Sequence, residues 1–306
     1  VWVFCSMKNI FKISIFLLIL ITSGLSYFYI LNYNSSDTEV VDNGLPNKFY
    51  LINLDRQNDR WELISEQFAK YKISLERFSA TDGFLVAIED ADSKERFAGA
   101  DLTAKLKHLD ADRNYNIYCD ANNSMPSFTY SFDSSRPPLT AGEFGLKCST
   151  IRLWSKIKES NEIALVFEDD IQLFGAFDRH IEEILAALPN KWDLVYLDNS
   201  EHNVDSAFFM QNLRTINNHL LKLISGSKKH LYDSYAYIIN SNSARKLLNF
   251  SNNYSDLTVE EILYKAINNE NIVALIAKNK ILGLKKIQSE IDMMGRWEKN
   301  DSKQRN

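Results

Sequence analysis

The chain has 306 residues, of which 45% are hydrophobic and 25% are charged, and its formal net charge is −5. This length and apolar content are enough for the core of one large α/β domain or of two small ones. The negative charge, without a dense basic segment, excludes a typical nucleic-acid-binding protein, so no nucleic-acid partner is expected.

The N-terminal residues predict a membrane anchor. Residues 13–31 are largely apolar, and as a helix with a rise of ~1.5 Å per residue they would span roughly 28 Å, close to a bilayer core. Lys8 and Lys12 precede this run, so the positive-inside rule leaves residues 1–12 in the cytosol and gives a single-pass, type II-like topology. The bulk of the chain would face the Golgi or ER lumen in a eukaryote, or lie at the inner membrane in a bacterium. The alternative is a cleaved signal peptide with small residues at 24–26.

Composition also predicts the domain boundaries. Residues 32–48 are polar and contain glycine and proline, which indicates a stem between the anchor and a folded domain. The periodic patterns of that domain run over residues 49–291, with a weakly periodic insertion at 84–138. Residues 292–306 are charged and are expected to form a frayed tail.

The first strong elements form a βαβ unit. Residues 49–54 predict a strand, apolar residues at helical spacing from Trp61 to Tyr71 predict a helix, and residues 75–80 predict a second strand. Such a unit predicts a parallel sheet. Neither G-x-G-x-x-G nor G-x-x-x-x-G-K-[ST] follows the first strand, which argues against a dinucleotide-binding fold and a P-loop NTPase.

Polar side chains gather where the first predicted strand ends. They are Asn53, Asp55, Arg56 and Arg60. Two arginines at this place could meet the base, ribose or phosphates of a nucleotide. The alternative is that they form surface ion pairs.

The insertion at 84–138 is too long for an ordinary loop and is expected to be functional or mobile. Within it, residues 91–109 are expected to contain a charged helix, whereas residues 115–132 are rich in aromatic residues. These aromatic rings could stack on sugars or form a small satellite core. Cys119 and Cys148 are interpreted as buried small residues, and a disulfide between them would require an oxidising compartment. Neither a CxxC spacing nor a zinc-ligand pattern is present.

A helix is predicted from Thr140 to Ser160. Thr140 followed three residues later by Glu143 forms a capping box, which is a sufficient local role for Glu143. Ser149 and Arg152 lie further along the same helix and could point at a site.

The strongest functional signal is the run of apolar residues 164–167 followed by Glu168, Asp169 and Asp170. The apolar run predicts a strand buried on both faces of a parallel sheet, and ligands of open α/β sheets bind outside the carboxyl ends of the strands. Adjacent carboxylates repel one another and are costly to desolvate, and a divalent cation such as Mg²⁺ or Mn²⁺ would relieve both effects. The alternative is a solvated loop after a core strand.

The C-terminal half continues the alternation of helices and strands. Helices are predicted over 177–188, 244–250 and 259–267, and strands over 192–197, 220–224, 235–239 and 272–277. Residues 201–218 form a polar loop that is suitable for a lid. Glu260 and Glu261 begin the last helix, where acids interact favourably with the helix dipole, and one of them could also act as a general base.

Six patterns, in their order and spacing, resemble those of glycosyltransferase family 25, which contains lipopolysaccharide β-galactosyltransferases and procollagen galactosyltransferases. They are I-N-L-D-R-x-x-x-R at 52–60, A-x-D-G at 80–83, G-E-x-G-x-x-x-S at 142–149, E-D-D at 168–170, W-D-x-V-Y-L at 192–197, and aromatic-A-Y-I-I followed by A-x-x-L-L at 235–248. The resemblance covers roughly residues 49–291. Leu146 and Thr150 stand where the family has Cys and His, and T-V-E-E at 258–261 stands where it has P-V-D.

The resemblance implies a GT-A-like, Rossmann-related α/β fold with a mostly parallel sheet flanked by helices. It also implies metal-dependent, inverting transfer of a hexose, most simply galactose, from a UDP-sugar to a glycan or to a glycoprotein or lipid-linked acceptor. Mn²⁺ or Mg²⁺ would be held by Asp170 and Asp169, and Glu260 or Glu261 would be the base. The nucleotide sugar would contact Asn53, Asp55, Arg56, Arg60, Glu143, Ser149, Glu168 and Asp169.

Two alternatives use the same residues. A catalytically impaired relative could act as a membrane-anchored sugar- or nucleotide-binding protein, which the residues at 150 and 258–261 would favour. A metal-dependent phosphohydrolase could use the same acids to cleave nucleotide sugars without any acceptor.

Overall fold

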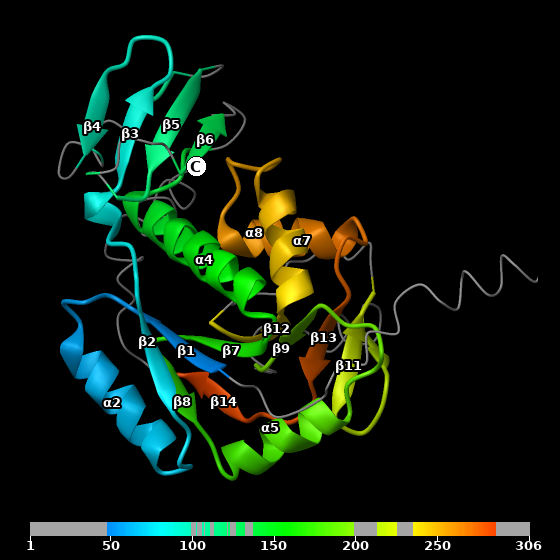
Figure 1. Cartoon of the computed structure of the whole chain (residues 1–306). Helices are drawn as coiled ribbons and strands as arrows, with labels where there is room; N and C mark the ends of the chain where they lie inside the picture. Colours follow the sequence, from blue (N-terminus) through cyan, green and yellow to red (C-terminus); the bar gives the residue numbers. More distant parts are fainter. Residues whose placement is uncertain are drawn as a thin grey trace, which may run out of the picture. The chain divides into compact units, whose positions relative to one another are not determined.

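The structure is a computed structural model of the whole chain (Figure 1), and it describes residues 48–98, 102, 106, 108–110, 113–120, 122, 127–131, 137–198, 213–224 and 235–285. All of these belong to one compact unit, Gly44–Asn306. The predicted anchor, nearly all of the predicted stem, the tail and most of the predicted lid lie outside the described residues. No helix within the described ranges is both long and apolar enough to span a bilayer.

The centre of the described chain is an eight-stranded sheet with the order β10-β11-β13-β9-β12-β7-β1-β2. Its strands are β1 (Lys48–Asn53), β2 (Leu75–Ser79), β7 (Ile163–Glu168), β9 (Leu194–Tyr196), β10 (Leu213–Thr215), β11 (Leu220–Leu223), β12 (Ala236–Asn240) and β13 (Ala274–Ala277). β1 pairs in parallel with β2 and with β7, and β9 pairs in parallel with β13. β12 runs antiparallel to both β7 and β9, and β11 antiparallel to β13. The predicted α/β fold with a mostly parallel sheet is therefore confirmed.

Helices cover both faces of this sheet (Figure 1). They are α2 (Asn58–Ala69), α4 (Ala141–Ser160), α5 (Phe177–Ala186), α7 (Ser241–Ser251) and α8 (Val259–Asn268). Because successive residues of a strand point to opposite faces, Val166 packs in one core with residues of α4, α7 and α8, whereas Phe167 packs in a second core with residues of α2 and α5. The two cores explain why β7 is apolar without alternation.

The insertion is not an irregular loop but a second, smaller sheet. Its strands are β3 (Ala87–Asp90), β4 (Arg96–Ala98), β5 (Asn114–Tyr118) and β6 (Phe128–Ser131), all antiparallel in the order β4-β3-β5-β6. Of the range 91–109, in which a charged helix was predicted, residues 91–98 form a turn and β4, whereas Leu102 and Leu106 are helical. The alternation of apolar residues in these strands was too short to reveal them.

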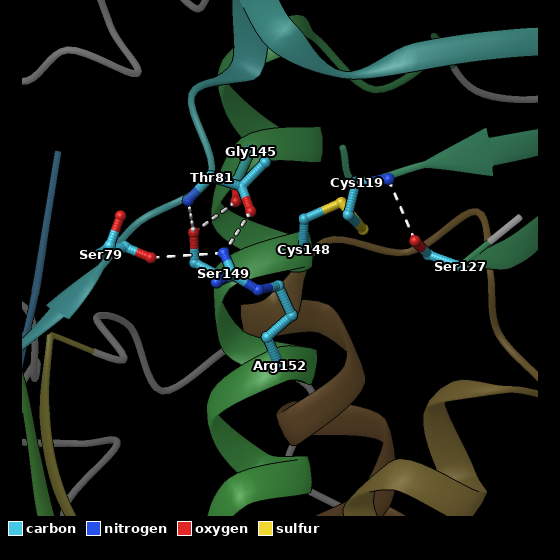
Figure 2. The surroundings of a disulfide bond; sticks show 8 residues. All are labelled: Ser79, Thr81, Cys119, Ser127, Gly145, Cys148, Ser149 and Arg152. Atoms are coloured by element: carbon cyan, nitrogen blue, oxygen red, sulfur yellow. Dashed lines mark hydrogen bonds between the residues drawn. A yellow bond between two sulfur atoms is a disulfide. The ribbon is translucent and has the colours of Figure 1, made fainter. Parts of the chain in front are cut away.

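One face of the small sheet packs on α4. Ile88, Ile117 and Tyr130 share a buried cluster with Phe144 of α4, so the satellite core is confirmed, and the buried Tyr130 is not placed to stack on a sugar. Cys119 and Cys148 are buried as predicted, and they are also joined by a disulfide with a Cα–Cα distance of 5.4 Å. This bond links the end of β5 to α4 (Figure 2).

Two shorter elements complete the described fold. A 3₁₀ turn, η1 (Gly83–Leu85), joins β2 to the small sheet. β8 (Ile171–Leu173) follows β7 after a two-residue turn and pairs with β14 (Leu282–Leu284) as a two-stranded sheet. β8 and β14 were not predicted from the sequence.

Candidate active site

The acidic segment lies at the carboxyl edge of the large sheet. Because β1, β2, β7 and β9 run in the same direction, Asn53, Ser79, Glu168 and Asp198 all follow or end strands at this edge. β12 enters from the same edge, where the Glu168 N–H donates to the Tyr235 carbonyl at 2.8 Å. This is the location at which open α/β sheets bind ligands.

Asp169 is held between the end of β1 and the first turn of α2. The Asn53 side-chain amide donates to one carboxylate oxygen at 2.6 Å, and the Arg60 guanidinium donates to the other at 2.9 Å. The Arg60 and Asp169 side chains are only 12% and 15% exposed, so their charge-assisted hydrogen bond is well shielded from water. The structure therefore brings together three of the predicted site residues from separate parts of the chain.

Glu168 is the last residue of β7, and alternation along the strand puts it on the same face as Val166. That face carries the buried tyrosines Tyr237 and Tyr196. Trp154 donates its indole N–H to the Tyr237 hydroxyl at 3.0 Å. Burial raises the pKa of Tyr237, and the negative charge of Glu168 adds to this effect.

The charge of Glu260 acts on the second of these tyrosines, Tyr196. Burial raises the pKa of Tyr196, and the neighbouring Tyr237 and then Glu260 raise it further. Tyr196 lies two residues before Asp198 on the carboxyl edge. Glu260 therefore lies close enough to Tyr196 of β9 to act on it electrostatically.

Asp55 and Arg56 join the β1–α2 loop to the segment that follows β2. Arg56 forms an ion pair with Asp82, whose carboxylate also accepts from the Phe84 N–H at 3.0 Å and caps η1. The Ser79 hydroxyl donates to Asp55 at 2.8 Å. Both arginines of the cluster, Arg56 and Arg60, thus have carboxylate partners, and only Arg60 contacts the acidic segment among the contacts described.

Glu143 and Glu261 cap their own helices. In each case a threonine hydroxyl accepts the glutamate N–H, and the glutamate carboxylate accepts the threonine N–H, at 2.7 Å for Thr140 and 2.9 Å for Thr258. The capping box predicted at Thr140 is confirmed. The two glutamates beside one another in α8 therefore differ, because Glu261 caps the helix and Glu260 does not take part in the capping box.

Ser149 fastens α4 to the segment after β2 (Figure 2). Its hydroxyl accepts from the Thr81 N–H at 2.8 Å and donates to the Gly145 carbonyl at 2.7 Å, and the residue is 1% exposed. A Cβ at Gly145 would lie 2.8 Å from the Gly83 nitrogen and from the Thr81 carbonyl oxygen. The small residues of two sequence patterns are therefore needed for this close packing of backbones.

Asp193 of the W-D-x-V-Y-L pattern is also structural. It is 4% exposed and accepts hydrogen bonds from Ser243 at 3.0 Å, Lys246 at 2.7 Å and the Val273 N–H at 2.8 Å. It thus joins the start of β9 to α7 and to the segment before β13. Its role is to hold the sheet that carries the edge.

Asp198 was not among the predicted site residues, although it follows β9 as the other acids follow β7. One carboxylate oxygen of Asp198 and the side-chain oxygen of Asn53 are buried without a hydrogen-bond partner among the described residues. In the part of the chain that the structure describes, no three Asp, Glu, His or Cys side chains gather as a metal site. A Mg²⁺-type site needs only one or two protein carboxylates when phosphates and water complete its shell, so the residues of this edge fit such an ion.

The family profile described as "Glycosyltransferase family 25 (LPS biosynthesis protein)" matches residues 47–263. The matched region contains Asn53, Arg60, the three acids after β7, Asp198 and Glu260. The chain belongs to glycosyltransferase family 25.

A relative in Aedes aegypti named "Glycosyltransferase 25 family member" is 26% identical to this family 25 chain over 202 residues. The alignment covers 65% of this chain and 27% of that relative, so the chain corresponds to about a quarter of the mosquito protein. Thr150, which stands where the family pattern has histidine, is 2% exposed in α4. The departure at this position therefore lies in the interior of the protein.

Proposed function

We propose that the chain transfers a hexose, most simply galactose, from a UDP-sugar to a hydroxyl group of a glycan or glycoconjugate acceptor. The observation that supports this most strongly is the Arg60–Asp169–Asn53 cluster at the carboxyl edge, where Asp170 and Asp198 also follow strands. The proposal includes a GT-A-like placement of the donor across this edge and a requirement for Mn²⁺ or Mg²⁺. Hexose identity comes from the family resemblance.

The acids at this edge would have different roles. Both carboxylate oxygens of Asp169 already accept hydrogen bonds, so Asp169 would orient Arg60. Asp170 would hold the cation, with Asp198 as a second oxygen ligand. A bound divalent ion would act as a Lewis acid and stabilise the charge of the departing diphosphate.

The nucleotide would be bound by groups at the end of β1. Arg60 is fixed by Asp169 with one N–H, and a guanidinium has further N–H donors that could meet a phosphate. The side-chain oxygen of Asn53 is buried without a partner among the described residues, and it could accept a hydrogen bond from uracil or ribose. Asp55, Arg56, Glu143 and Ser149 would support the shape of the site through the contacts described above.

Glu260 would be the general base. In an inverting transfer, the carboxylate takes the proton of the acceptor hydroxyl as its oxygen bonds to the anomeric carbon, and the bond from that carbon to UDP breaks. Glu261 is less suited to this role because its carboxylate caps α8. Val259 and Ile262, on either side of Glu260, pack in the same core as Tyr196 of β9, which supports a position near the edge.

The proposal also includes where the protein lies in the cell. We propose that residues 13–31 anchor the chain in a membrane, with the enzyme domain on an oxidising, lumenal side. The Cys119–Cys148 disulfide supports this side, because disulfides are rare in the reducing cytosol. Protease protection of the domain in intact microsomes would test it, and digestion without permeabilisation would contradict it.

The central experiment is a screen of UDP-sugars with Mn²⁺ that measures released UDP with and without glycan acceptors. Asp170→Asn should lower turnover about 100-fold or more, whereas Asp178→Asn, an exposed acid in the first turn of α5, is the matched control. Undiminished turnover in Asp170→Asn would contradict the metal assignment. Metal-dependent UDP binding without turnover would favour the impaired relative, and acceptor-independent hydrolysis would favour the phosphohydrolase.

A further inference from the structure

A lysine is buried in the middle of α4. Lys147 is 1% exposed, and its ammonium group donates to three backbone carbonyls, at 2.5 Å to Ser255, 2.9 Å to Leu257 and 3.3 Å to Tyr254. Burial of an ammonium is costly unless hydrogen bonds compensate for the lost water. The three carbonyls provide this compensation, so the ammonium and the backbone that carries them are held together.

The three carbonyls belong to one loop. Residues 252–258 connect α7 to α8, and Leu257 directly precedes Thr258, the N-cap of α8. The carbonyl oxygens converge on the ammonium as they would on a bound metal ion. Lys147 thus fixes the backbone that leads into the first turn of α8, where Glu260 lies.

The start of α8 is held against the large sheet as well. Val259 and Ile262, on either side of Glu260, are buried in the same core as Tyr196 and Tyr237. A small shift of the loop would therefore move Glu260 relative to the carboxyl edge. Misplacement by about 1 Å can cost two orders of magnitude in rate when a reacting group must be aligned.

The same part of α4 also binds the small sheet. The Lys147 ammonium lies 5.2 Å from the centre of the Phe128 ring of β6, and the Ser131 N–H donates to the Ser255 hydroxyl at 3.2 Å. The next residue, Cys148, carries the disulfide to Cys119. Two consecutive residues of α4 therefore fasten two separate elements, the α7–α8 loop and the small sheet.

We propose that Lys147 is a positioning residue for the transfer reaction, and that its ammonium takes the place of a structural cation to hold Glu260 at the carboxyl edge. This inference rests on the proposed function and on Glu260 as its base. It assigns Lys147 no contact with donor or acceptor. Its effect should therefore be seen in turnover and pass through Glu260.

The test uses Lys147→Met in the full chain, with Lys156→Met as the matched control. Lys156 lies on the same helix, and its side chain is 46% exposed. In Lys147→Met we expect kcat for acceptor transfer to fall about 10- to 100-fold, with an unchanged KM for the UDP-sugar and a folded protein by circular dichroism. Lys156→Met should keep the wild-type kcat.

A double-mutant cycle separates positioning from a general loss of structure. In a Glu260→Gln background, Lys147→Met should cause little further loss, because both changes remove the same contribution. A full additional loss would overturn the inference, and so would an unchanged kcat in Lys147→Met alone. If Lys147→Met does not fold, Lys147→Gln keeps a shorter donor in the same place and should lose part of kcat through the same cycle.

The outcomes also distinguish this inference from the proposed function. If the wild-type chain turns over no sugar donor, the proposed function fails and the inference fails with it. If the wild type is active and Lys147→Met, or Lys147→Gln in its place, keeps its kcat, only the inference fails. If the variant shows faster hydrogen exchange at residues 258–261 together with the loss of kcat, the inference is supported.

Discussion

The large sheet and the small sheet are stabilised in different ways. The large sheet has parallel strands that are buried on both faces, so its stability is spread over many apolar contacts. Among the described residues, the small sheet is held by more local links, which include one buried cluster on α4, a disulfide, and the ion pair of Arg113 with Asp90. The large sheet, which carries the candidate site, should therefore remain folded when the disulfide or the ion pair of the small sheet is removed.

Removal of the disulfide should have the largest effect on the difference in stability between the two sheets. Cys119 and Cys148 are 29 residues apart, and a cross-link over a loop of this length contributes about 3 kcal/mol in the chain-entropy account. The double variant Cys119→Ser, Cys148→Ala should expose the small sheet to protease first. Fluorescence of Trp61, Trp154 and Trp192 should show that the large sheet unfolds later.

The control for this variant is Cys5→Ser, which lies outside the described residues. It should leave both transitions unchanged. Simultaneous loss of both sheets in the double variant, at one midpoint by cleavage and by fluorescence, would show that the two regions unfold as a single cooperative unit.

A second change should destabilise both sheets together, because it affects the packing of α4 on the segment between β2 and η1. In Gly145→Ala, the new Cβ would lie 2.8 Å from backbone atoms of Thr81 and Gly83, and these cannot move like the end of a flexible side chain. We expect a loss of about 2 kcal/mol in the free energy of unfolding, measured by urea titration. Ser155→Ala on the same helix is the control, and an unchanged midpoint in Gly145→Ala would contradict the close packing.

The same contrast explains how much could be predicted from the sequence. The acids after β7 and the cluster after β1 were predictable, because long apolar strands in a βαβ unit bring their carboxyl ends to one edge. The small sheet was not, because its strands have three to five residues and their partners are set by packing on α4. Lys147 was missed because a lone lysine in a helix is usually solvated.

A third variant changes the candidate site and leaves the contacts of the small sheet intact. Arg60→Ala leaves Asp169 with only the Asn53 amide among the contacts described, and we expect a loss of about 1 kcal/mol in stability, since both side chains are mostly but not fully buried. Affinity for UDP in the presence of Mn²⁺, measured by calorimetry, should fall about tenfold. Arg179→Ala, whose side chain is 65% exposed in an ion pair on α5, should bind UDP as the wild type does.

The smallest effect is expected from pH. Hydrogen bonds from Ser93 and Arg113 lower the pKa of Asp90 from 3.8 to about 2. Because the folded-state pKa is the lower one, this contribution to stability is complete above about pH 4 and is lost as the pH falls towards 2. In Arg113→Gln, hydrogen exchange of β3 should depend less on pH across this range, whereas Asp92→Asn should keep the wild-type profile. A pH profile of Arg113→Gln identical to that of the wild type would show that the Arg113–Asp90 ion pair does not stabilise the small sheet.

The binding of the Lys147 ammonium by three backbone carbonyls has a practical consequence for chelation experiments. A loop organised by a dissociable ion would loosen when EDTA strips that ion, but an ammonium belonging to the polypeptide is not extracted by any chelator. The α7–α8 connection should thus keep its conformation through demetallation and reconstitution. Activity that disappears on dialysis against EDTA and returns with added Mn²⁺ can accordingly be assigned to the donor half of the site.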